Sequence, residues 1–170
     1  MTLLLLMLAC GTSPSDEPIQ VATDGESAKQ AEPEPTLAEA WAALTDEASR
    51  HTWLMTQGEA VYLGGGQGGI ACRTCHKEDG KGIRGAYPPL VGQREHMGDC
   101  RQSATIVIEG LMGPMEVDGI TYNGVMTPQG ELLDDYEIAA VLTYVRNSWG
   151  NDYGDCSPSA VAAARKKDGP

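Results

Sequence analysis

Phenylalanine is absent from this chain of 170 residues, and aromatic residues make up only 5% of it. A core built from such a sequence is small, occupies one domain, and consists mainly of Leu, Ile, Val, Met and Ala side chains. Basic residues are scarce as well: 12 Lys and Arg stand against 24 Asp and Glu, which gives a formal net charge of −12. A charge balance of this sign argues against nucleic-acid binding.

A second pair of cysteines or histidines at metal-ligand spacing is also missing. A structural zinc site needs two such pairs, so the sequence argues against zinc. A thioredoxin-like dithiol would need a βαβ surround, which the flanking glycine-rich and charged stretches do not provide. Outside residues 72–76 the possible ligands are scattered singly, at Cys100, Cys156, His51 and His96.

Residues 72–76 read Cys-Arg-Thr-Cys-His, which is the attachment sequence of a covalently bound haem. Two cysteines one helical turn apart can add to neighbouring vinyl groups along one haem edge and form two thioethers. His76 then lies under the iron, which its neutral imidazole can bind from the proximal side. The sequence therefore predicts one covalent haem c on Cys72 and Cys75, and indicates an electron carrier.

The first ten residues carry an apolar stretch that is too short to span a membrane and fits an export signal. Ala9 followed by Cys10 resembles the cleavage and lipidation site of bacterial lipoproteins, in which Cys10 would become the acylated N-terminus. No Lys or Arg precedes the apolar run, which departs from that pattern. The alternative is an ordinary signal peptide that is cut short.

The haem motif supports export independently, because covalent attachment takes place outside the cytoplasm in the bacterial systems that this sequence resembles. If Cys10 carries lipid and residues 72 and 75 carry haem, Cys100 and Cys156 remain. We expect these two to form a disulfide in an oxidising compartment, with two free thiols as the alternative.

Composition divides the chain into consecutive stretches. The export signal (1–10) is followed by an acidic linker (11–35), rich in Pro, Ser, Glu and Asp, which is expected to be a disordered tether. A helical extension (36–50) begins at the capping box of Thr36 and Glu39. The haem domain spans residues 51–155, and residues 156–170 form a C-terminal tail.

Helical periodicity predicts helices from Thr52 to about Leu63 and over residues 104–111, although the second stretch also favours a strand by side-chain type. A terminal helix begins at residues 134–137, which form a capping box, and ends at Gly150. Asp118-Gly119 between two short apolar runs predicts a β-hairpin. Residues 64–69, Gly-Gly-Gly-Gln-Gly-Gly, lack the Lys-Ser/Thr ending of a phosphate loop and are expected to be a flexible insertion.

These elements, arranged in this order around the haem motif, resemble the small monohaem class I cytochromes c with histidine and methionine ligation. The resemblance covers about residues 51–155 and implies an all-α fold of about four to five helices around the haem, with a short β-hairpin in the distal loop region. It is closest to cytochrome c domains associated with periplasmic dehydrogenases and reductases. The matching segments are 110–114 (Gly-Leu-Met-Gly-Pro), 122–128 (Tyr-Asn-Gly-Val-Met-Thr-Pro) and 138–146.

The resemblance also assigns the distal iron ligand. In that family it is the methionine of an Asn-Gly-Val-Met-x-Pro stretch, which corresponds here to Met126. A thioether suits ferrous iron and raises the reduction potential relative to two histidine ligands. The rival ligands are Met97, Met112 and Met115.

Three further residues match family positions. Pro88 lies in the segment whose proline carbonyl accepts a hydrogen bond from the proximal histidine, which orients the ring. Gly58 and Tyr62 match the contact of the first helix with the last, for which Val141 and Tyr144 are the expected partners.

Together with the lipoprotein-like Ala9-Cys10 start, the resemblance implies an exported, lipid-anchored periplasmic carrier of single electrons, whose partners are other redox proteins. No small-molecule substrate is expected, because a six-coordinate iron has no open position. The alternatives are an electron-accepting subunit of a periplasmic dehydrogenase or reductase, a haem enzyme with an open distal site, and a soluble periplasmic location. Four basic residues could form a positive docking collar around the haem edge or be ordinary solvated charges: Arg73, Lys77, Lys81 and Arg84.

Overall fold

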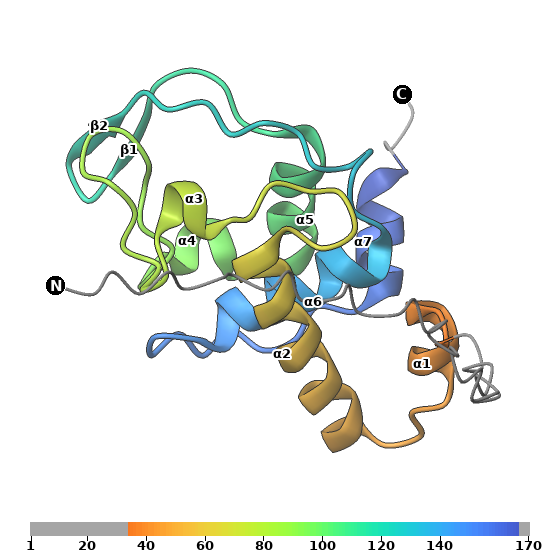
Figure 1. Cartoon of the computed structure of the whole chain (residues 1–170). Helices are drawn as coiled ribbons and strands as arrows, with labels where there is room; N and C mark the ends of the chain where they lie inside the picture. The colour runs from red at the N-terminus through yellow and green to blue at the C-terminus, as the bar shows by residue number, and fades with distance from the viewer. Residues whose placement is uncertain (1–33, 167–170) are drawn as a thin grey trace, which may run out of the picture. The chain divides into compact units, whose positions relative to one another are not determined.

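Helices dominate the computed structural model, which describes residues 34–166 (Figure 1). This part of the chain contains seven helices and one two-stranded hairpin, which confirms the expected all-α fold with a short hairpin. The expected export signal, Cys10 and most of the linker 11–35 lie outside the described residues. The elements are α1 (Leu37–Ala42), α2 (Glu47–Gly64), α3 (Arg73–His76), α4 (Arg94–Met97), α5 (Cys100–Glu109), β1 (Met115–Val117), β2 (Ile120–Tyr122), α6 (Asp135–Asn147) and α7 (Pro158–Arg165).

Side-chain caps determine where the first two helices begin. The predicted capping box is confirmed at α1, where the Thr36 hydroxyl accepts the N–H of Glu39 and the Glu39 carboxylate accepts the N–H of Thr36. The Asp46 carboxylate caps α2 by accepting the N–H of Ser49 at 2.8 Å. This cap starts α2 earlier than its apolar pattern alone predicts. Neither α2 nor any other described helix is long and apolar enough to cross a membrane.

The crossing of α2 and α6 is the most extensive helix contact in the described residues. A Cβ at Gly58 would lie only 2.1 Å from the carbonyl oxygen of Ala140 and 2.7 Å from the Cβ of Tyr144. The ring of Tyr62, one turn further along α2, packs on the ring of Tyr144 with centroids 5.5 Å apart. The predicted role of Gly58 and Tyr62 in this contact is confirmed, with Ala140 in place of Val141 as the partner of Gly58.

We expect Gly58→Ala to lower the free energy of unfolding of the holoprotein by about 3 kcal/mol, because the added methyl group meets backbone that cannot move aside. Gly64→Ala is the matched control on the same helix, since nothing lies within 4 Å of the position that its added methyl group would take. That change is expected to be neutral or to stabilise by about 0.5 kcal/mol. Guanidinium unfolding of both variants measures the difference, and equal midpoints would contradict the close-contact argument.

The hairpin and the helix before it follow the sequence pattern. Residues 100–109 form α5, so the 3.6-residue period outweighs the β-branched side chains that favoured a strand. In the hairpin Met115 pairs with Tyr122 and Val117 with Ile120. The two turn residues Asp118 and Gly119 have φ of 50° and 70°. Positive φ at both central positions is what a type I′ turn requires, and Asp-Gly supplies it at low cost.

The start of α6 is confirmed and its end is not. Asp134 accepts the N–H groups of Tyr136 and Glu137, and the Glu137 carboxylate accepts the N–H of Asp134. The apolar residues along one face of this helix are buried, and they are Ile138, Val141, Leu142 and Val145.

The helix stops at Asn147 rather than at Gly150, because Ser148 is already extended, with φ −104° and ψ 162°, and Trp149 follows it with a φ of 54°. The Trp149 indole then packs against two tyrosine rings, with centroids 5.2 and 5.7 Å away. The Asn151 amide donates to the carbonyl of Val145 at 2.8 Å and so satisfies the helix end from beyond the turn. The side chain of Asn151, and not Gly150, therefore caps the end of this helix.

Residues 156–170 were expected to be a tail, and α6 the terminal helix, but residues 158–165 form α7. This helix packs on α5 and α6, and Val161 is fully buried in the core. A disulfide joins Cys100 at the start of α5 to Cys156 just before α7, with the Cα atoms 5.5 Å apart. The physical reason for the difference is that a short helix needs tertiary anchors, which a sequence pattern does not display.

The glycine-rich segment 64–69 is held against the start of α6 instead of forming a loose insertion. The N–H of Gln67 donates to the buried carboxylate of Glu137 at 2.7 Å. Gly66 has a φ of 59°, which favours glycine, and Cβ atoms at Gly66 and Gly69 would lie 2.3 Å from the Glu137 carboxylate oxygen and 2.7 Å from a Leu133 methyl group, so both side chains would have to shift. The segment therefore delivers the haem motif from a fixed position.

Candidate haem site

The two free cysteines of the described residues lie on a single turn of helix, α3, with Cys72 as its N-cap. The carbonyl of Cys72 accepts the N–H groups of Cys75 at 3.2 Å and His76 at 2.9 Å. The Tyr62 hydroxyl of α2 donates to the carbonyl of Lys77 at 2.5 Å and fixes the end of the turn. Both thiols and the imidazole line one cavity, as the attachment chemistry requires.

The imidazole of His76 is oriented by its Nδ1, which lies 3.0 Å from the carbonyl oxygen of Pro88. In the tautomer that donates this hydrogen bond, Nε2 carries the free lone pair and can bind a metal. The pKa of His76 is lowered, because burial outweighs the opposing effect of the Pro88 hydrogen bond. The imidazole is therefore neutral near pH 7 and ready to act as a ligand.

Burial also raises the pKa of the Cys72 thiol to about 11. A thiol with such a pKa is protonated at neutral pH, and a protonated thiol reacts slowly with oxidants and disulfides.

The cavity has a volume of about 740 Å³, within the range typical of cofactor sites. No Asp, Glu, Lys or Arg is among the described residues that line it. An apolar, planar cofactor fits such a wall, whereas a phosphate-bearing or strongly charged ligand would lack partners. Its aliphatic wall includes Ile70, Leu90, Ile106, Val107, Leu111 and Val141.

Four methionines line this cavity: Met97, Met112, Met115 and Met126. The main chain of Met126 forms a two-way bridge with Leu111, with both hydrogen bonds at 2.9 Å. Met112, by contrast, is 83% exposed. Met126 is thus held in place by main-chain bonds to Leu111, as Met115 is by its pairing with Tyr122, whereas Met112 is exposed.

The expected positive collar is weaker than its sequence indicates. Arg73 pairs with Glu78 at 2.8 Å, and Lys81 pairs with Asp79 at 3.0 Å. All four of these side chains are substantially exposed, so each pair contributes little to stability. Their effect is to neutralise half of the four basic residues that surround the haem motif.

Gln129 is a functional residue that the sequence analysis did not identify. Its buried side chain accepts the N–H of Ile70 at 2.9 Å and donates to the carbonyl of Thr127 at 3.0 Å. It therefore links the segment that leads into Cys72 with the loop that carries Met126. No local sequence pattern predicts this link, because Ile70 and Gln129 are 59 residues apart.

Comparison with known proteins identifies the family. A family model described as Cytochrome c matches residues 55–149. The chain belongs to the cytochrome c family. It is 40% identical over 84 residues to a cytochrome c-552 of Thermus thermophilus, a match that covers 47% of this chain and 63% of that protein.

A second relative is the cytochrome c subunit of a quinone alcohol dehydrogenase from Gluconobacter oxydans. It is 29% identical over 117 residues, which cover 64% of this chain and 23% of that protein. The chain thus spans less than two thirds of the length of either relative.

Membership of the cytochrome c family makes haem c the cofactor and electron transfer the function that the domain implies. The residues fit this group: Cys72 and Cys75 would hold it through thioethers, His76 would bind its iron, and the uncharged cavity would enclose its ring. The haem supplies a one-electron ferric/ferrous couple. The polypeptide supplies the walls, the orientation of His76 and the exclusion of water.

Replacing both attachment cysteines, Cys72→Ala with Cys75→Ala, is expected to abolish covalent haem completely. The matched control replaces the other described pair, Cys100→Ala with Cys156→Ala, and should keep one haem per chain. Mass spectrometry and haem staining after denaturing electrophoresis measure the outcome, in a host that attaches haem covalently. Covalent haem on the first variant would show that the thioethers form elsewhere.

Proposed function

We propose that this chain transfers single electrons through a haem c whose iron is bound by His76 and Met126. The observation that supports the proposal is that His76 and Met126 line the same cavity and that both are held in place. The His76 ring is oriented by the Pro88 carbonyl, and the main chain of Met126 is bridged to Leu111. Figure 1 shows the segments on either side of the hairpin running along the top of the view, apart from α3. Thr127 and Pro128 stiffen the loop directly after Met126.

Two features favour a carrier over an enzyme. An iron with two protein ligands has no open position for a substrate, so no small-molecule substrate is needed. The uncharged wall of the cavity disfavours the additional positive charge of ferric iron, and a thioether ligand prefers ferrous iron. Both effects raise the reduction potential and suit exchange with other redox proteins.

Met126→Ala is expected to remove the sulfur-to-iron charge-transfer band of the ferric protein. The potential should fall by on the order of 0.1–0.2 V, part of the roughly 0.8 V over which axial ligands tune haem. Met112→Ala is the matched control, because that side chain is 83% exposed, and it should change neither quantity. Optical spectra and redox titration provide the measurements.

Carbon monoxide distinguishes the carrier from a haem enzyme with an open distal site. The unaltered ferrous protein should bind it slowly, and the Met126→Ala protein should bind it rapidly. Rapid binding by the unaltered protein, or an intact sulfur-to-iron band in Met126→Ala, would overturn the assignment of Met126.

The carrier is exported to the bacterial periplasm and held at a membrane by lipid on Cys10. The proposal is supported by the apolar stretch that ends in Ala9-Cys10 and by the haem motif, whose maturation takes place outside the cytoplasm. An acidic linker between Cys10 and the described residues would let the anchored domain reach partners near the membrane surface. Its partners are redox proteins, not nucleic acids.

Cys10→Ser is expected to move the holoprotein from the membrane fraction to the soluble periplasmic fraction, without changing its spectrum. A lipidated Cys10 would carry the acyl chains that hold the domain at the membrane, so loss of this cysteine releases the domain. Fractionation and intact mass measure the effect in a bacterium that lipidates exported proteins. A membrane fraction that stays unchanged would exclude Cys10 as the anchor.

A second candidate is an electron-accepting subunit of a dehydrogenase or reductase complex. It is favoured by the similarity to a cytochrome c subunit of a quinone alcohol dehydrogenase. Mild detergent extraction separates the candidates: a subunit co-purifies with an oxidoreductase in fixed ratio, whereas a free carrier does not.

A further inference from the structure

Arg165, near the C-terminal end of α7, reaches the stretch of chain that follows the Met126 loop. Its guanidinium donates to the carbonyl of Gly130 at 2.5 Å and to the carbonyl of Leu133 at 2.7 Å. It also pairs with the carboxylate of Asp135 at 2.5 Å. One side chain therefore binds three points between the distal loop and the first turn of α6.

The bound stretch is continuous with the loop that carries Met126. The N–H groups of Gln129 and Gly130 donate to the carbonyls of Val107 and Ile108 on α5, at 3.0 and 3.2 Å. Met126 itself is bridged to Leu111, just beyond α5. Main-chain hydrogen bonds thus join the Met126 loop to α5 and to Leu111. Arg165 joins the residues that follow this loop to α7.

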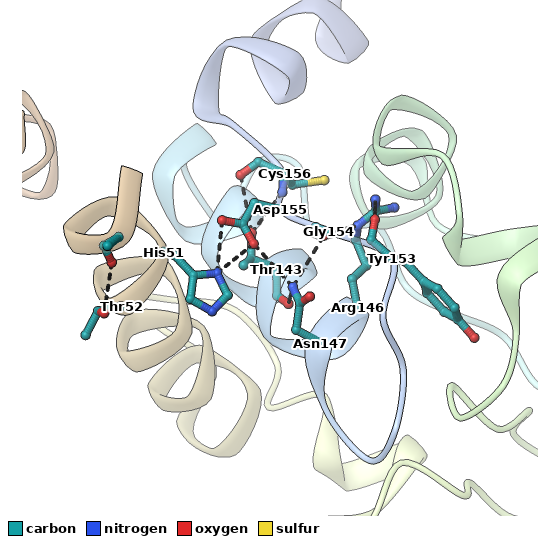
Figure 2. Close-up of polar contacts among 10 residues, drawn as sticks. His51, Thr52, Thr143, Arg146, Asn147, Tyr153, Gly154, Asp155 and Cys156 are labelled. Carbon is teal, nitrogen blue, oxygen red and sulfur yellow. Dashed lines mark hydrogen bonds and ion pairs between the residues drawn. The ribbon is translucent and has the colours of Figure 1, made fainter. Parts of the chain in front are cut away.

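The position of α7 is fixed by anchors that precede it. The disulfide attaches Cys156 to α5, and the hydroxyl of Thr143 bonds both to the N–H of Cys156 at 2.9 Å and to its carbonyl oxygen at 3.3 Å (Figure 2). The preceding main chain is held by Arg146, which donates to the carbonyls of Tyr153 and Gly154 (Figure 2). A helix anchored in this way is a rigid support for the guanidinium at its other end.

This support lies largely outside the part of the chain that the family model matches, which ends at residue 149. Thr143 and Arg146 fall within the matched part, whereas Cys156, helix α7 and Arg165 all lie beyond it. The helix and its guanidinium therefore lie outside the cytochrome c domain that the family model describes.

We propose that Arg165 is a positioning residue that keeps the Met126 loop closed and so holds Met126 on the iron. The inference rests on the proposed ligation by Met126. Without the guanidinium, the carbonyls of Gly130 and Leu133 lose their partner and Asp135 loses its counter-charge. These losses weaken the closed loop relative to an open one, in which water solvates the same groups.

An exogenous ligand measures the open population directly. Imidazole can bind ferric iron only when Met126 has left it, so its apparent affinity rises in proportion to the open fraction. We expect Arg165→Gln to bind imidazole about tenfold more tightly than the unaltered holoprotein. The sulfur-to-iron band of this variant should also bleach at a lower temperature than global unfolding.

Lys166→Gln is the matched control, since Lys166 is the exposed cation next in sequence, and it should leave imidazole affinity unchanged. Arg165→Lys retains a cation for Asp135 but not the fork that reaches two carbonyls, so it should bind imidazole with intermediate affinity. Cys100→Ala with Cys156→Ala keeps Arg165 but loosens its support, and it should also raise the affinity. This pair tests the inference even if Arg165→Gln does not fold.

Three results separate the possible failures. If Arg165→Gln lowers the unfolding midpoint and leaves imidazole affinity unchanged, Arg165 contributes to stability alone and the inference is overturned. If neither Arg165→Gln nor the double cysteine variant changes the affinity, the inference is likewise overturned. If Met126→Ala keeps the sulfur-to-iron band, the proposed ligand is wrong, whatever Arg165 does.

Discussion

A cavity of about 740 Å³, walled without Asp, Glu, Lys or Arg, is the constraint on which the rest of the described structure depends. The haem c that the family implies would fill this volume and complete the core, which the chain builds without any phenylalanine. The contact of α2 with α6 also supports the haem attachment turn. It positions Tyr62, which packs on Tyr144 and also bonds to the carbonyl of Lys77 at the end of the attachment turn.

The features that sequence predicted well have their causes within a few residues. The capping boxes at the starts of α1 and α6 join side chains three positions apart, and the Asp118-Gly119 turn depends on two adjacent φ angles. The haem motif is a contiguous pentapeptide whose chemistry is dictated by its order. The role of the Pro88 carbonyl was accessible only through family resemblance, since no spacing argument connects it to His76.

The features that sequence did not predict have distant causes. The end of α6 is an exception, because it depends on Trp149 and Asn151, a few residues beyond the helix, and not on Gly150 as predicted. Helix α7 is anchored across 56 residues by the disulfide, and Arg165 finds Asp135 across 30. Composition does not indicate which of four methionines is the distal iron ligand, and the structure places all four in the wall of the cavity.

The local pairing of Arg73 with Glu78 and of Lys81 with Asp79 has a kinetic consequence. At long range each pair acts as a dipole, whose field decays faster than that of a lone charge. Diffusing molecules are therefore steered mainly by the overall negative charge of −12, which attracts cationic surfaces when ionic strength is low. At about 0.15 M salt the Debye length shrinks to about 8 Å, and the final approach is then governed by short-range fit.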